Sequence, residues 1–256
     1  MMPVLFIGHG SPMNAVEDNA FTRGWREIAC RIPRPQAILC VSAHWYTAGT
    51  LVMDNANPKM IYDMYGFPRE LYEVVYAAPG APELARQTNG LLSGISVLDN
   101  TWGFDHGAWS VLRVMFPAAD IPVFQVSVDR NATPQAHYDI GRRLAPLREQ
   151  GVLILGSGNV VHNLGLVDFE LEGGYRWAEE FDRYITNAIR SGDHQKAIEF
   201  RRAGESARRA VPILDHYAPL LTALGAAEGD GDVLVFNDRC VMGSVSMACY
   251  LLVPGE

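Results

Sequence analysis

Residues 4–12 of the chain are Val4-Leu5-Phe6-Ile7-Gly8-His9-Gly10-Ser11-Pro12. The apolar run has the length of a buried strand, and it ends in a histidine between two glycines, which a Ser-Pro turn follows. Glycine lets the backbone turn tightly and lets a bulky group approach closely. The stretch therefore predicts a strand that carries the imidazole of His9 to its carboxyl end.

The same arrangement occurs twice more along the chain. The apolar run 37–43 is followed by His44, and the run 151–155 is followed by a Gly-containing loop that holds His162. One such histidine is most simply a buried ring whose nitrogens are satisfied by the backbone. Several of them at strand ends in one domain indicate a metal, because histidine is the commonest metal ligand.

Strand-like and helix-like segments alternate through most of the chain, which predicts an α/β fold with a sheet covered by helices on both faces. In such sheets, ligands bind outside the carboxyl ends of the strands, where His9, His44 and His162 belong. The last two strands suggest a mixed, mostly parallel sheet. The expected strands are 4–8, 37–43, 51–54, 95–98, 121–128, 151–155, 233–237 and 244–253, and the expected helices are 21–32, 82–92, 108–116, 134–150, 175–190, 193–203, 205–210 and 218–224.

Size and charge narrow the classes of function. No linker-like run interrupts the 256 residues, so we expect a single domain over 1–256. A net charge of −8 disfavours a nucleic-acid partner, because binding to phosphates depends on clustered Lys and Arg. The one basic cluster is interpreted as a solvated helix face; it consists of Arg201, Arg202, Arg208 and Arg209.

The sequence gives no indication of export or of membrane insertion. The N-terminal residues have no basic region with a cleavage site, and no run of about 18 apolar residues is present. The four cysteines show no C-x-x-C spacing, so we interpret them as small buried hydrophobic residues. These features predict a cytoplasmic protein that is a monomer or a small homo-oligomer. The cysteines are Cys30, Cys40, Cys240 and Cys249.

Of the seven histidines, five are expected in loops at the ends of elements. His106 lies where a loop enters a helix, and His216 precedes a helix. His137 and His194 lie in polar helical stretches and are expected to face solvent. The sequence has no H-E-x-x-H, G-x-S-x-G or P-loop motif, which argues against a zincin peptidase, an α/β-hydrolase and a nucleoside-triphosphate enzyme.

Taken together, the motifs resemble the 4,5-DOPA extradiol dioxygenase family, which belongs to the class III, LigB-like ring-cleaving dioxygenases. The likeness runs from about residue 3 to residue 252, with differences at Met64 and at Ala77-Ala78 in the loop that is expected to shape the pocket. The motifs are Gly8-His9-Gly10-Ser11-Pro12-Met13-Asn14, Ser42-Ala43-His44-Trp45, Tyr62-Asp63-Met64-Tyr65-Gly66-Phe67-Pro68, Gly103-Phe104-Asp105-His106-Gly107, Ser157-Gly158-Asn159-Val160-Val161-His162-Asn163 and His216-Tyr217.

The resemblance implies a three-layer α/β/α fold and a non-haem metal site. It places His9, His44 and His216 on the metal, His162 beside or on it, and His106 in the substrate pocket. Ferrous iron with protein ligands on one face leaves positions open for a catechol's adjacent oxygens and for dioxygen. A nearby histidine, His162, would act as the acid–base. The expected partners are a small aromatic diol and dioxygen, and zinc can occupy the site of the isolated protein because it binds nitrogen ligands more tightly than ferrous iron.

Two other interpretations remain open at this point. Three histidines with an open position also describe a catalytic zinc site, so a zinc-dependent hydrolase is the alternative function. A protein that only stores metal or binds a ligand is a further possibility. The aromatic stretch 61–67 argues against the latter, because it is suited to enclosing a flat ring.

Overall fold

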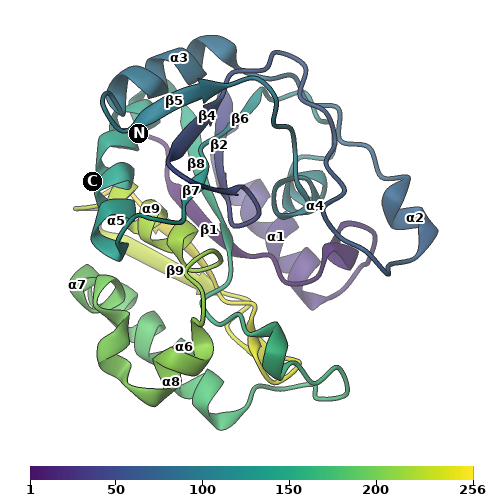
Figure 1. Cartoon of the computed structure of the whole chain (residues 1–256), viewed down its shortest axis with the longest axis vertical. Coiled ribbons are helices and arrows are strands. Elements are labelled where there is room, and N and C mark those ends of the chain that lie inside the picture. Colours follow the sequence, from purple (N-terminus) through teal and green to yellow (C-terminus); the bar gives the residue numbers. More distant parts are fainter. Residues whose placement is uncertain (256) are drawn as a thin grey trace.

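The computed structural model describes residues 1–255, and its centre is a six-stranded sheet with the order β6-β2-β8-β1-β12-β9 (Figure 1). Strands β6, β2, β8 and β1 run parallel, whereas β12 is antiparallel to both β1 and β9. The expected mixed, mostly parallel sheet is confirmed. The strands are β1 (Val4–Gly8), β2 (Ala37–Ser42), β6 (Val123–Gln125), β8 (Val152–Gly158), β9 (Asp232–Phe236) and β12 (Cys249–Val253).

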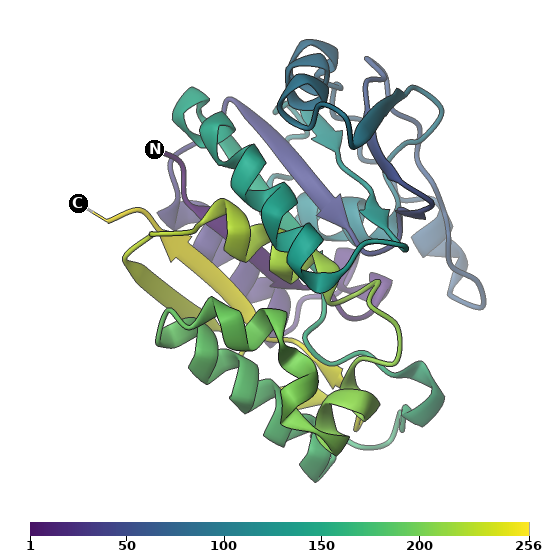
Figure 2. The same cartoon turned by 60° about the vertical axis from the view of Figure 1, so that its left-hand side comes forward.

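Helices cover both faces of this sheet, as the alternation of elements predicts. Helix α9 packs on β8 and β1 with α5 outside it, and α4 packs on β2 and β8 with α1 beside it. Figure 2 shows α5 and α9 in front of the sheet and α1 behind it. The bounds are α1 (Ala20–Arg31), α4 (His106–Met115), α5 (Pro134–Leu144) and α9 (Ala218–Ala226).

The remaining elements lie around this three-layer centre. Helix α6 packs against α7, α8 and β9, and small two-stranded sheets join β3 to β7, β4 to β5 and β10 to β11. Their bounds are α2 (Arg69–Tyr72), α3 (Pro82–Leu91), α6 (Arg176–Arg190), α7 (His194–Ile198), α8 (Glu205–Ala210), β3 (Tyr46–Thr47), β4 (Thr50–Met53), β5 (Ser96–Asp99), β7 (Val128–Asp129), β10 (Cys240–Val241) and β11 (Val245–Ser246), with 3₁₀ turns at Pro12–Ala15, Ala145–Gln150, Leu164–Leu166 and Phe200–Ala203.

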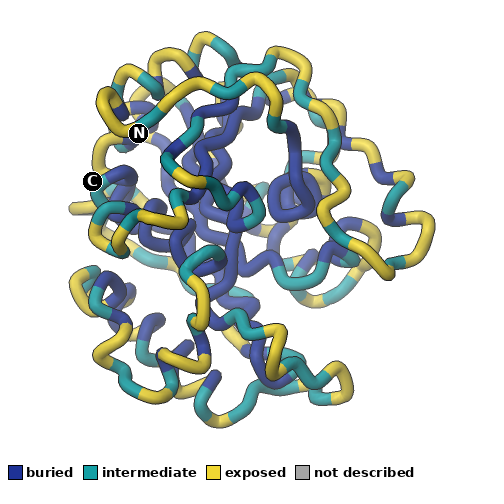
Figure 3. The backbone as a smooth tube through the Cα atoms, in the orientation of Figure 1, coloured by how far each residue is buried: buried dark blue, intermediate teal, exposed yellow. Residues whose placement is uncertain are grey.

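The central strands form the core. Every residue of β1, β2 and β8 is buried, as expected for continuously apolar strands inside a covered sheet (Figure 3). The buried hydrophobic residues form one contiguous cluster. Among residues 1–255, no helix has the length and apolar character needed to cross a membrane.

Four predicted elements are divided in the structure. The helix expected at 193–203 is divided into α7 (His194–Ile198) and the 3₁₀ turn Phe200–Ala203. The strand expected at 121–128 is interrupted after β6, because the backbone N–H of Ser127 bonds to Leu51 and that of Val128 bonds to Trp45, away from β2. The helix expected at 134–150 changes to a 3₁₀ turn at Ala145, since Pro146 lacks the N–H that an α-helix needs. The last expected strand, 244–253, is split into β11 and β12, which have different partners.

Two expectations of exposure and burial are wrong. His137 is buried, with 2% of its surface exposed, because it lies on the face of α5 that packs towards α9. Cys30 is exposed, because α1 buries Trp25 and Ile28 on its other face. His194 is half-buried, and its Nδ1 lies 3.0 Å from the hydroxyl of Tyr138.

Candidate metal centre

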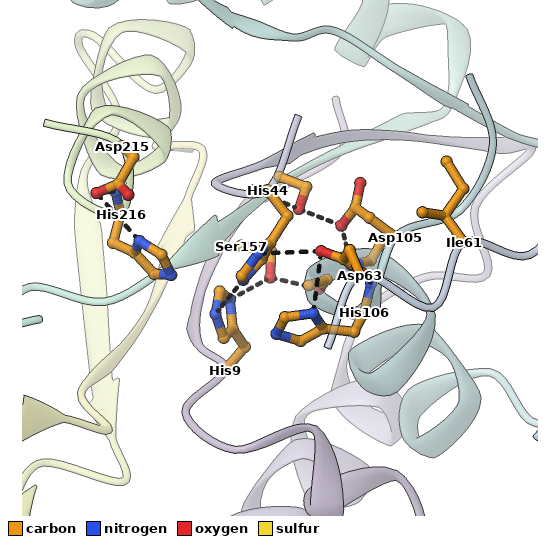
Figure 4. A network of polar contacts seen from close by, with 12 residues as sticks. His9, His44, Ile61, Asp63, Asp105, His106, Ser157, Asp215 and His216 are labelled. Atoms are coloured by element: carbon orange, nitrogen blue, oxygen red, sulfur yellow. Dashed lines mark hydrogen bonds and ion pairs between the residues drawn. The ribbon is translucent and has the colours of Figure 1, made fainter. Parts of the chain in front are cut away.

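Five histidines meet beyond the carboxyl ends of the central strands, four of which are labelled in Figure 4. They come from five separate segments of the chain, and they are the five that the sequence places at element ends. His9 follows β1, His44 follows β2, His106 opens α4, His162 follows β8, and His216 precedes α9.

Close backbone packing fixes the position of His9. Gly10 has φ 59°, in the left-handed region, and a Cβ there would lie 2.4 Å from Sδ of Met247. A Cβ on Gly8 would lie 2.7 Å from the carbonyl carbon of Met247. The backbone N–H of His9 donates to the carbonyl of Gly158 at 3.0 Å. The two glycines therefore provide the tight turn and the close approach that the sequence predicts.

Hydrogen bonding determines which nitrogen of His9 carries the proton. The hydroxyl of Ser157 donates its only hydrogen to the carbonyl of Gly107, at 2.6 Å. The same hydroxyl lies 3.0 Å from Nδ1 of His9, so it must accept from an Nδ1–H there. Nε2 of His9 then carries a free lone pair.

His44 also carries its ring hydrogen on Nδ1, for a different reason. Its Nδ1 lies 3.1 Å from Oδ2 of Asp63, and a carboxylate oxygen favours a hydrogen on the nitrogen that faces it. The backbone N–H of His44 donates to the hydroxyl of Ser42, which itself donates to Oδ1 of Asp105. This arrangement leaves Nε2 of His44 as a free acceptor.

The two free nitrogens face each other, with Nε2 of His9 3.3 Å from Nε2 of His44. Facing lone pairs repel unless a cation lies between them. Burial, followed by the neighbouring histidines, holds the pKa of His9 well below 6.5, so a proton is poorly suited to this role. Two nitrogens bound to one metal at about 2.0–2.1 Å in tetrahedral geometry are about 3.3 Å apart. The pair fits two ligands of one metal ion.

His216 completes a triangle with this pair. Its ring centroid lies 5.3 Å from that of His9 and 5.0 Å from that of His44, and the His9–His44 separation is 5.2 Å. Rings whose nitrogens bind one metal at about 2.1 Å have centroids about 4.6 to 5.3 Å apart, for octahedral and tetrahedral angles respectively. Nδ1 of His216 lies 3.1 Å from Oδ1 of Asp215, which accepts the backbone N–H of His216 at 2.7 Å.

The other two histidines are placed differently. The ring of His106 lies 3.7 Å from that of His44 but 6.0 Å from that of His9. His162 lies flat on His216, with centroids 3.4 Å apart and ring planes 8° from parallel. Two groups of side chains have possible metal-ligand atoms that all lie within 4.8 Å of one another. One group is His9, His44 and His106, and the other is His162, Asp215 and His216.

Burial keeps the imidazoles of His216, His106 and His162 neutral. It lowers the pKa of His216 well below 6.5, lowers that of His106 against the opposing effect of Asp63, and lowers that of His162 to about 4. Burial alone would raise the pKa of Asp63, but its interactions with His106 and His44 outweigh this effect and hold that pKa well below its usual range. The centre therefore combines neutral nitrogen donors with an ionised carboxylate.

Asp105 supports the centre, and sequence reasoning assigned it no role. It caps α4 by accepting from the backbone N–H of Ala108, and it also accepts from Ser42, Trp102 and Gln125. An Asp directly before a helix is a recognisable N-cap signal. Its contact with Ser42 crosses 63 residues, and no local pattern predicts that contact.

The chain is similar to known proteins along almost its whole length. A family described as the catalytic LigB subunit of aromatic ring-opening dioxygenase matches residues 3–248. The 4,5-DOPA dioxygenase extradiol of Escherichia coli K12 is 45% identical over 251 residues, which cover 96% of this chain and 93% of that protein. The protein of the same name from Beta vulgaris is 37% identical over 253 residues, which cover 96% and 94%. A crystal structure of an uncharacterized E. coli K12 protein superposes with a TM-score of 0.84 at 38% identity, covering 98% of this chain and all of the other.

Proposed function

The chain belongs to the family of the catalytic LigB subunit of aromatic ring-opening dioxygenases. From this premise we propose that it is an extradiol dioxygenase that uses ferrous iron and dioxygen to open the ring of a DOPA-like catechol. Relatives named 4,5-DOPA dioxygenase extradiol support the choice of substrate.

The observation that carries the proposal is the pair of facing Nε2 atoms of His9 and His44, 3.3 Å apart. With His216 as the third ligand, the nitrogens of these three histidines would hold the metal. When bound, ferrous iron supplies open positions for both catechol oxygens and for dioxygen, together with the redox chemistry that zinc lacks.

His162 is assigned the acid–base role. Its ring lies parallel to that of His216, with centroids 3.4 Å apart, so His216 would hold the metal and His162 would stand beside it. The lone pair of an imidazole lies in the plane of its ring, so a ring stacked on His216 would not share the metal that His216 would hold. His162 is neutral at pH 7 and can accept a proton from a catechol hydroxyl and later return it, and it is a metal ligand only if its ring leaves the stack.

His106 is assigned to the substrate. It opens α4 and reaches the centre from the side of His44. The aromatic stretch 61–67 lies next to it, because the backbone N–H of His106 donates to Asp63 and the indole of Trp109 donates to the carbonyl of Ile61. This loop is placed to cover a flat ring bound at the metal.

The decisive experiment removes all metal and reloads the protein anaerobically with either ferrous iron or zinc. Addition of DOPA and air to the iron-loaded protein is expected to consume dioxygen and form a yellow ring-opened product, and the zinc-loaded protein is expected to be inactive. Full oxygen-dependent activity of an iron-free zinc sample would contradict the proposal. Hydrolysis of esters or amides by the zinc form, without oxygen uptake by the iron form, would establish the zinc hydrolase instead.

The setting of the reaction is part of the same proposal. An aromatic diol and dioxygen are the two substrates, and the cytoplasm is the expected compartment. Size-exclusion chromatography with light scattering would determine whether the protein is the expected monomer or small homo-oligomer.

A further inference from the structure

One carboxylate contacts two histidines of the centre at once. Oδ2 of Asp63 lies 3.1 Å from Nδ1 of His44 and 3.1 Å from Nδ1 of His106 (Figure 4). Its other oxygen, Oδ1, accepts the backbone N–H of His106 at 2.9 Å. Both oxygens of Asp63 are therefore engaged with groups that hold the proposed metal and substrate.

The loop that carries Asp63 is fixed in place on both sides. The backbone N–H of Ile61 donates to the carbonyl of Phe104 at 2.7 Å, and the hydroxyl of Tyr62 donates to the carbonyl of Val74 at 2.7 Å. The side chain of Asp63 is 21% exposed. Among residues 1–255, no Lys or Arg lies within ion-pair distance of it. The two imidazoles are therefore the ionisable groups that its carboxylate faces.

A carboxylate beside Nδ1 has a definite effect on a ligating histidine. It keeps the hydrogen on Nδ1, orients the ring and makes Nε2 a better donor to a metal. Because a single oxygen of Asp63 faces both rings, it favours the tautomer with the hydrogen on Nδ1 in His44 and in His106. Both Nε2 atoms are then acceptors.

We propose that Asp63 is a positioning residue that serves metal and substrate at the same time: through His44 it raises the affinity for the metal, and through His106 it presents an acceptor nitrogen to the substrate. The proposal rests on the proposed function for the identity of metal and substrate. Its physical content, the effect of one carboxylate on two ring tautomers, is testable without turnover.

The first test measures zinc binding to the metal-free protein, with a chelator as competitor. Asp63→Asn has the same shape but no charge, and it is expected to weaken zinc binding about 10- to 100-fold, the usual effect of losing such a partner. Glu73→Gln is the control, because it also removes one negative charge, and the side chain of Glu73 pairs with the exposed Arg69. Thermal unfolding of each variant checks that the fold is retained, and Asp63→Ser replaces Asp63→Asn if the latter unfolds.

The second test reads the tautomers directly by nitrogen-15 NMR of the imidazole rings in the metal-free protein. The wild type is expected to show Nδ1–H for His44 and His106, and Asp63→Asn is expected to shift both rings towards Nε2–H. A residue with a merely structural role would leave these tautomers unchanged. Unaltered zinc affinity and unaltered tautomers in folded Asp63→Asn would overturn the inference. A wild type that binds no metal at all would instead overturn the proposed function.

Discussion

The ring of His162 lies on the ring of His216 in a parallel stack, with centroids 3.4 Å apart. This relationship separates two roles that histidines at a metal centre can have. A ring in the stack cannot direct its lone pair at a metal that its neighbour holds. It can still exchange protons with a molecule bound at that metal.

The variant His162→Gln is therefore expected to keep its metal and to lose turnover. The rate constant kcat should fall by about 10² to 10⁴, the usual contribution of a positioned acid–base. Metal content by mass spectrometry and steady-state oxygen uptake measure the two quantities separately. His194→Gln, far along the chain in α7, is the control. Loss of metal from His162→Gln would show that His162 is an ordinary ligand.

Substitutions of His216 and Asp215 show which of the two binds the metal and which orients the other. His216→Ala is expected to abolish tight metal binding, because it removes one of the three rings that surround the proposed metal position. Asp215→Asn should weaken binding only about 10- to 100-fold, since Asp215 acts through Nδ1 and the backbone N–H of His216. Titration of both metal-free variants with zinc gives the comparison. The roles would have to be exchanged if Asp215→Asn emptied the site and His216→Ala did not.

The variant His106→Ala is expected to retain metal but to use the catechol poorly. Loss of a hydrogen bond to a charged substrate group costs about 1.5–3 kcal/mol, so kcat/KM should fall roughly 10- to 100-fold. Oxygen uptake at varied DOPA concentration measures this change. Near-normal kcat/KM would show that His106 has no role in substrate binding. Loss of the metal from this variant would show that His106 is a metal ligand.

Gly107 is expected to tolerate no side chain. A Cβ at this position would lie 2.5 Å from Oγ of Ser42 and 2.8 Å from Cδ2 of His44, so Gly107→Ala must displace a metal-centre residue. Overpacking of this kind costs about 1–3 kcal/mol in the free energy of unfolding, and zinc affinity should fall as well. Gly90→Ala is the matched control: Gly90 is also in a helix, and a Cβ there meets nothing within 4 Å. Equal stability of the two variants by chemical denaturation would contradict the prediction.

The buried carboxyl of Asp182 makes the stability of the protein depend on pH. Burial raises the pKa of this carboxyl from 3.8 to about 6, although Ser246 donates a hydrogen bond to it. Between these values the folded protein binds more protons than the unfolded chain. The free energy of unfolding therefore falls as pH rises from about 4 to about 6, by up to about 3 kcal/mol.

Asp182→Asn removes this dependence. Metal-free Asp182→Asn is expected to gain stability relative to wild type as pH rises from 4 to 7, and urea unfolding at several pH values measures the difference. The exposed Glu149→Gln is the control and should show no such trend. A difference between Asp182→Asn and wild type that does not change with pH would refute the assignment.

Local patterns in the sequence predict the elements of the fold and the positions of the histidines within them. The apolar run before His9, for example, requires a buried strand, and Gly8 and Gly10 require a close turn. Such patterns act over a few residues. They could not predict that Asp63 reaches His106 across 43 residues or that Ser157 reaches His9 across 148. They also missed the burial of His137, because a polar composition does not reveal which face of α5 meets α9.

The register of β1 bears on how the protein is made. Val4 pairs with Ile154 on one side and with Leu252 on the other, so the first strand has to wait for partners from the middle and the end of the chain. Contacts of such long sequence separation form late and slowly. During synthesis, His9 lacks β8 until residue 158 has been made, His216 until residue 216 has been made, and β12 until residue 253 has been made. Metal binding by the proposed ligands would therefore require at least 216 residues of the chain, and β1 reaches its final pairing only when residue 252 has been made.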